Sequence, residues 1–416
     1  MEEASFQELV EHTKRVMEPL GHSPSTRWHY DYAWRHLGDF FARHGETTFD
    51  AELAQQFVLE IREQYEQGAM KFWKFKLLRK SVEVLLDCQR TGCVTWRYAS
   101  RWGSGRLGVP ALQNILDEYL YELKTVGYGR GTMHLYAVVC RQLLDYFVRE
   151  NLLDPKDWAP QDISRFILYA STLYQPTSMR TVLSALRSIL KFAAERGLTS
   201  SALTHAVPSN SVRKRTIVPA ITKEEEERLL GAIDRGSSIG KRNYAVVLLA
   251  LRLGLRSVDI VNLKLENIQW RTNTITITQC KTGRPLTIPL LADVGNAIVD
   301  YLVHGRPKVQ SPYVFLRHEA PHVRLAERSG VYAIVSSCMK RAGVRQGKGE
   351  FRGPHCLRHS LAARLLASDT PLPIISSVLG HANKDTTKIY LSTDLEHLRI
   401  CALGLSGIEV AKGELQ

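Results

Sequence analysis

Apolar residues recur at helical spacing through most of this chain, and this periodicity limits the folds that it can adopt. Tyr30, Trp34 and Leu37 follow the i, i+4, i+7 pattern of a helix with one buried face. The clearest strand-like alternation of polar and apolar residues lies at 274–289. Two stretches rich in β-branched residues there flank a Lys-Thr-Gly-Arg turn, which predicts a β-hairpin. The sequence therefore predicts a mostly α protein with a small antiparallel β-sheet in its C-terminal part.

Two linkers divide the 416 residues into three blocks. The stretch 101–106 is rich in glycine, and the stretch 208–219 carries the basic cluster Arg213, Lys214 and Arg215. We expect an N-terminal helical domain at 1–104, a second helical domain at 107–207, a linker at 208–219 and a third domain at 220–416. Thr222 followed by Glu225 is a capping box, which predicts that a helix of the third domain begins there.

The first two blocks share a weak internal similarity. Thr26 and Phe41 recur as Thr132 and Phe147, both at an offset of 106. Helical bundles of similar length also give chance matches, so a duplication and an accidental similarity both stay open.

The chain is basic, with 55 Lys and Arg residues against 42 Asp and Glu and a net charge of +13. This excess favours a polyanionic partner such as nucleic acid, although a protein can be basic without one. The seven cysteines include no Cys-x-x-Cys pair, which disfavours a zinc module or a disulfide framework. The sequence also shows no signal core and no membrane-spanning run. We expect a cytoplasmic protein without a metal or cofactor.

Several polar residues of the third block stand in short, ordered motifs. They are Arg256 and Asp259 in Gly-Leu-Arg-Ser-Val-Asp, Lys281 in the hairpin turn, His355, Arg358 and His359 in His-Cys-Leu-Arg-His, His381 in Leu-Gly-His, and Tyr390 in Thr-Thr-Lys-Ile-Tyr. Each has an ordinary explanation by itself: Arg256 could pair with Asp259 at the surface, and Tyr390 could be a core residue. The complete set in this order is far more specific than any one member.

The ordered set resembles the tyrosine recombinase (phage integrase) family over about residues 216–395, and the 107–207 block resembles that family's core-binding domain. The resemblance implies an integrase-like, DNA breaking-rejoining fold. It also implies a metal-independent DNA strand transferase that works through a 3′-phosphotyrosyl intermediate and a Holliday junction. The catalytic residues that it implies are Arg256, Lys281, His355, Arg358, His381 and Tyr390.

These residue types suit phosphodiester cleavage. Negative charge grows on the non-bridging oxygens in the transition state, and arginines such as Arg256 and Arg358 can hold these oxygens through charge-assisted hydrogen bonds. His355, with an ordinary pKa of about 6.5, is a candidate base for the Tyr390 phenol, whose ordinary pKa is about 10. Lys281 at the hairpin tip is the candidate acid for the leaving 5′-oxygen.

Two further residues are expected to support the site. Asp259 would orient Arg256 or cap the helix that follows, and His359 would brace the helix that carries His355. His381 would donate another hydrogen bond to the phosphate.

Basic residues outside the catalytic set are candidate contacts to the DNA backbone. They are Lys71, Lys74, Lys76, Arg79, Lys80, Arg130, Arg180 and Arg187, together with the linker residues Arg213, Lys214 and Arg215. The expected partners are double-stranded recombination sites and further copies of the chain in a tetramer. The helix at 395–403 would dock on a neighbouring subunit, or alternatively pack on its own.

The additional block at 1–104 favours an integrase or transposase of a mobile element, acting on nucleoid DNA in a prokaryotic cell. Two other classes stay open at this point. A type IB-like topoisomerase would use similar chemistry, and a catalytically silent protein would only bind DNA.

Overall fold

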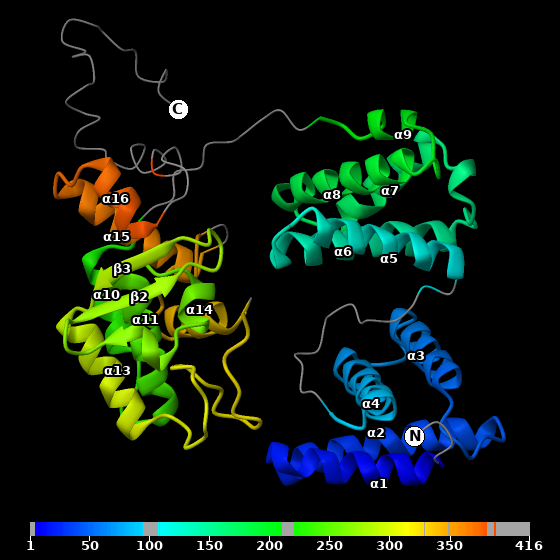
Figure 1. Ribbon diagram of the computed structural model, residues 1–416, viewed down its shortest axis with the longest axis horizontal. Helices are drawn as coiled ribbons and strands as arrows, with labels where there is room; N and C mark the ends of the chain where they lie inside the picture. The colour runs from blue at the N-terminus through cyan, green and yellow to red at the C-terminus, as the bar shows by residue number, and fades with distance from the viewer. Residues whose placement is uncertain are drawn as a thin grey trace, which may run out of the picture. The chain divides into compact units, whose positions relative to one another are not determined.

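The structure is a computed structural model that describes residues 5–94, 107, 109–209, 220–327, 329–347, 350–380 and 387. Two compact units divide the chain near residue 214. Helices dominate both units, and the second also contains a three-stranded antiparallel sheet. The predicted fold class is thus confirmed (Figure 1).

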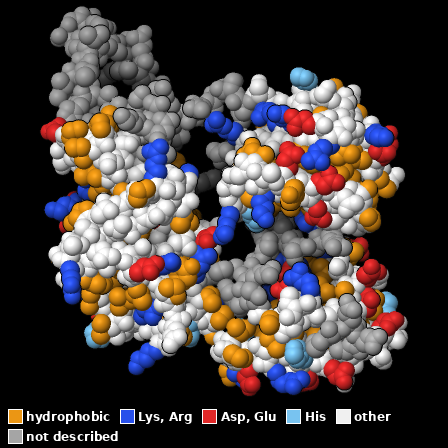
Figure 2. All heavy atoms as spheres, viewed as in Figure 1, with side chains coloured by type: hydrophobic (Ala, Val, Ile, Leu, Met, Phe, Trp, Pro, Cys, Tyr) orange, Lys and Arg blue, Asp and Glu red, His pale blue; other side chains and the backbone are white. Residues whose placement is uncertain are grey.

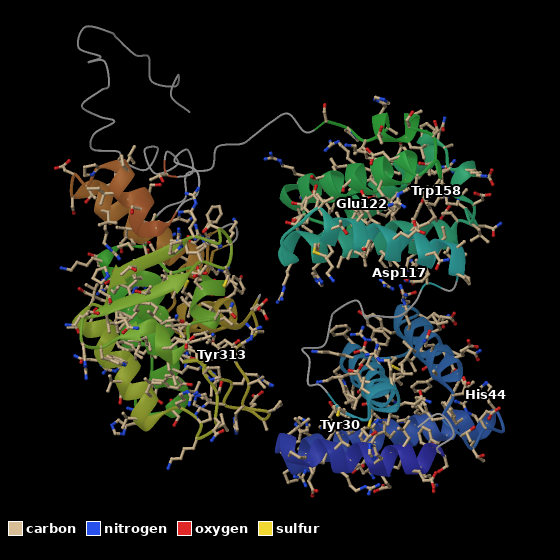
Figure 3. The ribbon with its side chains drawn as sticks, in the orientation of Figure 1. Tyr30, His44, Asp117, Glu122, Trp158 and Tyr313 are labelled. Atoms are coloured by element: carbon tan, nitrogen blue, oxygen red, sulfur yellow. The ribbon has the colours of Figure 1, made fainter. Side chains whose placement is uncertain are left out.

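The first unit begins with one group of helices (blue in Figure 1). It consists of α1 (Phe6–Met17), η1 (Glu18–Leu20), α2 (Pro24–Arg43), α3 (Ala51–Glu66) and α4 (Phe72–Thr91). The side chains of Ser5, Ser23 and Asp50 cap α1, α2 and α3 by accepting hydrogen bonds from first-turn amides. Trp34 packs against Tyr30, which is labelled in Figure 3. Its Nε1 donates to the Ser81 carbonyl at 3.1 Å, which ties α2 to α4.

A second group of helices completes the first unit. It consists of α5 (Pro110–Thr125), α6 (Arg130–Arg149), η2 (Pro155–Asp157), α7 (Pro160–Leu173), α8 (Pro176–Glu195) and α9 (Ala202–His205). Proline opens α5, α7 and α8, where its missing N–H costs nothing. Trp158 lies in the core of this group, with its ring 4.5 Å from that of Phe147 and its Nε1 donating to Leu152 (Figure 3).

The second unit contains the predicted hairpin. Its helices are α10 (Lys223–Gly231), α11 (Ser238–Arg252), α12 (Ser257–Val261), η3 (Leu265–Asn267), α13 (Ala292–His304), α14 (Gly330–Arg341), α15 (Pro354–Ala367) and α16 (Leu372–Leu379). Its strands are β1 (Ile268–Gln269), β2 (Thr274–Thr278) and β3 (Pro285–Pro289), in the order β1-β2-β3. Ile275 pairs with Ile288, and the Thr222 capping box begins α10 as predicted.

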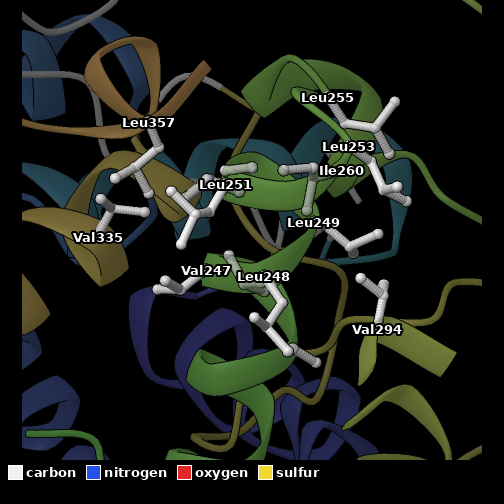
Figure 4. Packing of buried hydrophobic residues seen from close by; sticks show 14 of the residues in the cluster. Val247, Leu248, Leu249, Leu251, Leu253, Leu255, Ile260, Val294, Val335 and Leu357 are labelled. Atoms are coloured by element: carbon white, nitrogen blue, oxygen red, sulfur yellow. The ribbon is translucent and has the colours of Figure 1, made fainter. Parts of the chain in front are cut away.

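Helix α11 is the centre of the second unit. Every residue from Ala245 to Leu251 is buried, and α11 packs against α13, α14 and α15. Leu249 and Val294 belong to this core (Figure 4), and the sheet contributes Ile275 and Ile288 to it. Among the described residues, no helix is both long and apolar enough to cross a membrane.

Shortening a side chain of α11 should destabilise the second unit. Leu249→Ala leaves a cavity in a fully buried position, and we expect a loss of about 2 to 5 kcal/mol in the free energy of unfolding. Leu265→Ala removes the same atoms from an exposed position and should change stability by less than about 0.5 kcal/mol. Urea denaturation of the full chain measures both, and equal effects would contradict the central position of α11.

Candidate active site

Arg256 and Arg358 meet at the end of one helix. Arg256 is the N-cap residue of α12, directly after the turn that follows α11, and Arg358 lies on α15. Arg358 donates from Nη2 to the Leu379 carbonyl at 2.5 Å, and Arg256 donates from Nη2 to the Gly380 carbonyl at 2.9 Å. Two residues far apart in the sequence thus place their guanidinium groups at the C-terminal end of α16.

Two glycines make this convergence possible. Gly254 has a φ of +61° and presents its carbonyl to Nη1 of Arg358 at 2.5 Å; a Cβ there would lie 2.9 Å from side-chain atoms of Leu361 and Leu379. Gly380 has a φ of +60°, and a Cβ would lie 2.1 Å from the amide nitrogen of Gln279. Only glycine adopts this backbone readily and leaves room for these neighbours.

Asp259 lies in the first turn of α12, and its side chain is buried. Its Oδ1 accepts a hydrogen bond from the backbone N–H of Cys280 at 2.9 Å, which ties α12 to the hairpin beside Lys281. Burial raises the pKa of Asp259, whereas the Cys280 amide and the positive charge of Arg256 lower it. Asp259 therefore ties the hairpin to α12, and its role in orienting Arg256 or capping the helix stays a prediction.

His355 lies in the first turn of α15 and shares the electrostatic surroundings of the arginines. Desolvation lowers the pKa of this imidazole, and the positive charges of Arg358, Lys281 and Arg256 lower it further. The same charges therefore act on one ring from three different segments of the chain. The ring remains neutral at neutral pH, which is the form that can accept a proton.

His359 lies one turn further along α15, and its ring centroid is 6.4 Å from that of His355. Burial lowers the pKa of His359 to about 4, with smaller contributions from His355 and Arg358. It therefore remains uncharged at neutral pH beside the more exposed His355. A bracing role for His359 stays a prediction.

Gln279 is a neighbour of the site that the sequence pattern did not indicate. It is buried directly before the hairpin turn, accepts a hydrogen bond from Thr282 Oγ1 at 2.8 Å, and donates to the Leu379 carbonyl at 3.5 Å. Gln279 thus contacts the Leu379 carbonyl, which also accepts a hydrogen bond from Arg358. A single polar residue at a strand end carries no periodic signal, so only the folded chain reveals this contact.

His381 and Tyr390 lie outside the described residues, as do Arg213, Lys214, Arg215 and the predicted helix at 395–403. Among the residues that the structure does describe, no cluster of three or more His, Cys, Asp or Glu side chains could hold a metal ion.

The predicted DNA contacts differ in their exposure. Lys71, Lys76, Arg130 and Arg180 are exposed, and Lys74, Lys80 and Arg187 are partly exposed. Arg187 donates to the carbonyl of Pro208, at the start of the predicted linker. Basic side chains are visible on the surface of both units in Figure 2.

Arg79 is the exception among these residues, because only 4 % of it is exposed. It lies over the ring of Phe75 and pairs with Glu83 at 3.5 Å. A side chain buried in this way is not available to a DNA backbone, so Arg79 is withdrawn as a candidate contact.

Comparison with known proteins identifies the class. A model of the phage integrase family matches residues 219–397. The putative integrase/recombinase y4rA of Sinorhizobium fredii is 37 % identical over 280 residues, covering 67 % of each chain. The tyrosine recombinase XerA of Pyrococcus furiosus is 28 % identical over 286 residues, covering 68 % of this chain and 91 % of that one.

A solved structure shares the fold. XerH site-specific recombinase bound to palindromic difH substrate, in a post-cleavage complex, aligns with a TM-score of 0.53 at 18 % identity, covering 84 % of this chain and 95 % of that one. The fold and these relatives define an enzyme of the tyrosine recombinase class, which carries out site-specific recombination. The chain belongs to the phage integrase family.

Substitution of Gly380 should disturb the end of α16 in two separable ways. Gly380→Ala combines an unfavourable φ with the contact to Gln279, and we expect a loss of about 2 kcal/mol or more in the free energy of unfolding. Gly283→Ala is the matched control, because it has a φ of +67° with no atom within 4 Å, and it should cost only about 1 to 2 kcal/mol.

Relief of the contact should separate the two contributions. Gly380→Ala should cost less in a chain that already carries Gln279→Ser than in the unsubstituted chain, because the shorter side chain leaves room for the Cβ. Urea denaturation measures the two single variants, the double variant and the Gly283→Ala control. A Gly380→Ala chain as stable as the unsubstituted one would contradict the close packing at this turn.

Proposed function

We propose that this recombinase cuts and rejoins double-stranded DNA through a covalent bond to Tyr390, in the integration or transposition of a mobile element. The observation that carries the proposal is the convergence of Arg256 and Arg358 at Leu379 and Gly380. His381 follows Gly380 directly in the sequence, and Tyr390 completes the same motif. The relatives named as recombinases and integrases support this assignment.

The two arginines would stabilise the transferring phosphate. Arg358 is 5 % exposed, and carbonyls of Gly254 and Leu379 accept from its two terminal nitrogens. These bonds fix the plane of the guanidinium, whose planar fork of N–H donors suits a phosphate. Arg256, which is more exposed, would also donate hydrogen bonds to the non-bridging oxygens. His381 would donate to the same phosphate.

Proton transfer would be divided between His355 and Lys281. The neutral imidazole of His355 accepts the proton of the Tyr390 phenol as its oxygen attacks phosphorus. The bond from phosphorus to the 5′-oxygen breaks, and the Lys281 ammonium gives that oxygen a proton. This leaves a 3′-phosphotyrosyl ester and a free 5′-hydroxyl. Attack by the hydroxyl of a partner strand reverses these steps, forms a Holliday junction, and requires no ATP.

The rest of the chain would hold the substrate. The block at 107–207 would act as a core-binding domain, with Arg130, Arg180 and Arg187 on phosphates and the linker at 208–219 along the backbone. A tetramer on paired sites would assemble through the segment at 395–403. The reaction would take place on nucleoid DNA in the cytoplasm of a prokaryote. A topoisomerase or a silent DNA-binding protein is less favoured, since the relatives are recombinases.

Removal of the Tyr390 hydroxyl should abolish the covalent intermediate. The substrate is a nicked duplex carrying the sequences that border the gene, and the product is an SDS-resistant protein–DNA adduct. The unsubstituted chain should form it and Tyr390→Phe should not, whereas Tyr332→Phe, at an exposed tyrosine of the same unit, should retain it. Adduct formation by Tyr390→Phe would contradict the assignment of Tyr390 as the nucleophile.

The rate of adduct formation should depend on the protonation of His355. Because desolvation and the nearby cations lower its pKa, the rate should stay high down to pH 6.5 and decline only below it. His355→Gln should remove this acid limb and slow the reaction by roughly a hundredfold or more. Rates of adduct formation at subsaturating DNA between pH 5 and 8, which report the pKa of the DNA-free enzyme, measure this effect. If the rate of the His355→Gln variant still fell at low pH as in the unsubstituted chain, the fall would be due to another group.

A further inference from the structure

The turn that carries Lys281 is held through the residue that precedes it. The turn closes on itself, because the Gln279 N–H donates to the Arg284 carbonyl at 2.9 Å and the Gly283 N–H donates to the Gln279 carbonyl at 2.8 Å. Among the described residues, no hydrogen bond or ion pair holds the ammonium of Lys281, an exposed residue with a flexible stem. The backbone therefore sets where this ammonium can reach, and Cys280 attaches that backbone to α12.

The two holds on Cys280 both come from α12. Asp259 accepts from the backbone N–H of Cys280 at 2.9 Å, and Asn262, the C-cap residue of α12, donates from Nδ2 to the Cys280 sulfur at 3.5 Å. One contact is to the backbone and the other to the side chain, so together they restrain both the position and the rotation of this residue. Arg256 is the N-cap residue of the same helix. The hairpin of Lys281 and the first arginine of the site thus share one support.

Arg324 determines which way the amide of Asn262 points. Nη1 of Arg324 donates to Oδ1 of Asn262 at 2.5 Å, and a guanidinium has no acceptor, so the amide oxygen must face it. The Nδ2 group is thereby turned to the Val258 carbonyl at 2.8 Å and to the sulfur of Cys280. Loss of the arginine would remove this restraint, and an amide turned the other way presents an oxygen to the sulfur.

Arg324 is itself held on two sides. Its Nη2 donates to Oε1 of Glu327 at 2.7 Å, and its guanidinium lies 5.4 Å from the centroid of the Tyr313 ring, which is labelled in Figure 3. The segment of Tyr313 is attached directly after α12, since the Val314 N–H donates to the Leu263 carbonyl at 2.9 Å. The side chain of Arg324 is 31 % exposed, so its substitution does not open the core.

We propose that Asn262 and Arg324 are positioning residues for Lys281. Arg324 orients the amide of Asn262, Asn262 holds Cys280, and the turn presents the ammonium to the site. Lys281 lies close enough to His355 to lower the pKa of that imidazole. The inference rests on the proposed function, because it takes Lys281 as the acid for the leaving 5′-oxygen. A misplacement of about 1 Å can slow a reaction by roughly a hundredfold, so residues that never touch the substrate can control the rate.

The experiment removes the need for an acid. Sulfur replaces the bridging 5′-oxygen at the cleaved phosphate of a duplex that carries the sequences bordering the gene, after the unsubstituted chain has been used to map the cleavage position. The Tyr390 oxygen forms its bond to phosphorus, the P–S bond breaks, and the electron pair leaves on sulfur. Because a thiol has a pKa of about 8.5, this thiolate leaves without a proton. Rates of adduct formation on the sulfur and oxygen substrates are compared for the full-length chain and its variants.

Substitutions that act through Lys281 should be repaired by the sulfur substrate. Lys281→Ala should slow the oxygen substrate by roughly a hundredfold or more and leave the rate on the sulfur substrate close to that of the unsubstituted chain. Asn262→Ala and Arg324→Gln should slow the oxygen substrate by roughly tenfold or more, with the same repair by sulfur. In the Lys281→Ala background, Arg324→Gln should have no further effect, because the group that it positions is absent.

Arg306→Gln is the matched control within the same segment. Arg306 donates to four carbonyls that lie outside α12 and the hairpin, those of Val309, Ser311, Tyr313 and Val314. Any rate that this variant loses should be lost on both substrates alike, so the ratio of its two rates should equal that of the unsubstituted chain. The melting temperature of each variant checks the fold, and Asn262→Ala tests the same link without changing a charge.

Four results would overturn the inference alone. They are an unchanged rate on the oxygen substrate in both positioning variants, equal slowing on both substrates while Lys281→Ala is repaired, further slowing by Arg324→Gln in the Lys281→Ala background, and repair of Arg306→Gln to the same extent. If sulfur does not repair Lys281→Ala, the proposed acid is wrong and the inference falls with it. If the unsubstituted chain forms no adduct on either substrate, the proposed function itself is contradicted.

Discussion

The candidate site depends on the attraction between two arginines and the carbonyl end of α16. The last carbonyls of a helix carry a partial negative charge, so a cation placed there is stabilised. Arg256 and Arg358 both occupy this position, although two guanidinium groups at one place repel each other. Gly254 offsets part of that cost with another carbonyl, and the carboxylate of Asp259 adds a negative charge nearby. The result is a preorganised cationic site.

The lowered pKa of His355 is a consequence of the same charges. Arg358, Lys281 and Arg256 all disfavour its protonation, and desolvation acts in the same direction. The same cluster of cations therefore also keeps the imidazole of His355 in its neutral form. Binding of an anion would add negative charge next to the ring and raise its pKa, which favours proton uptake when substrate is present. One electrostatic arrangement can thus serve both tasks.

The sequence predicted the parts of the site that have a local signal. Regular alternation predicted β2 and β3, the capping box predicted α10, and the ordered motifs predicted which arginines belong together. It did not predict β1, since two residues are too short to show a period. The contact of Asp259 with Cys280 could not be predicted either, because it joins two segments that meet only through the fold.

Arg79 shows a different limit of prediction from the sequence. Composition groups it with its basic neighbours, yet it lies between Phe75 and Val82 on the side of α4 that faces the core. Helical spacing would have placed it there, whereas charge alone suggested an exposed contact. Its burial is tolerated because Glu83 supplies an opposite charge and Phe75 an aromatic face. The position of a basic residue on its helix is therefore more informative than its membership of a basic run.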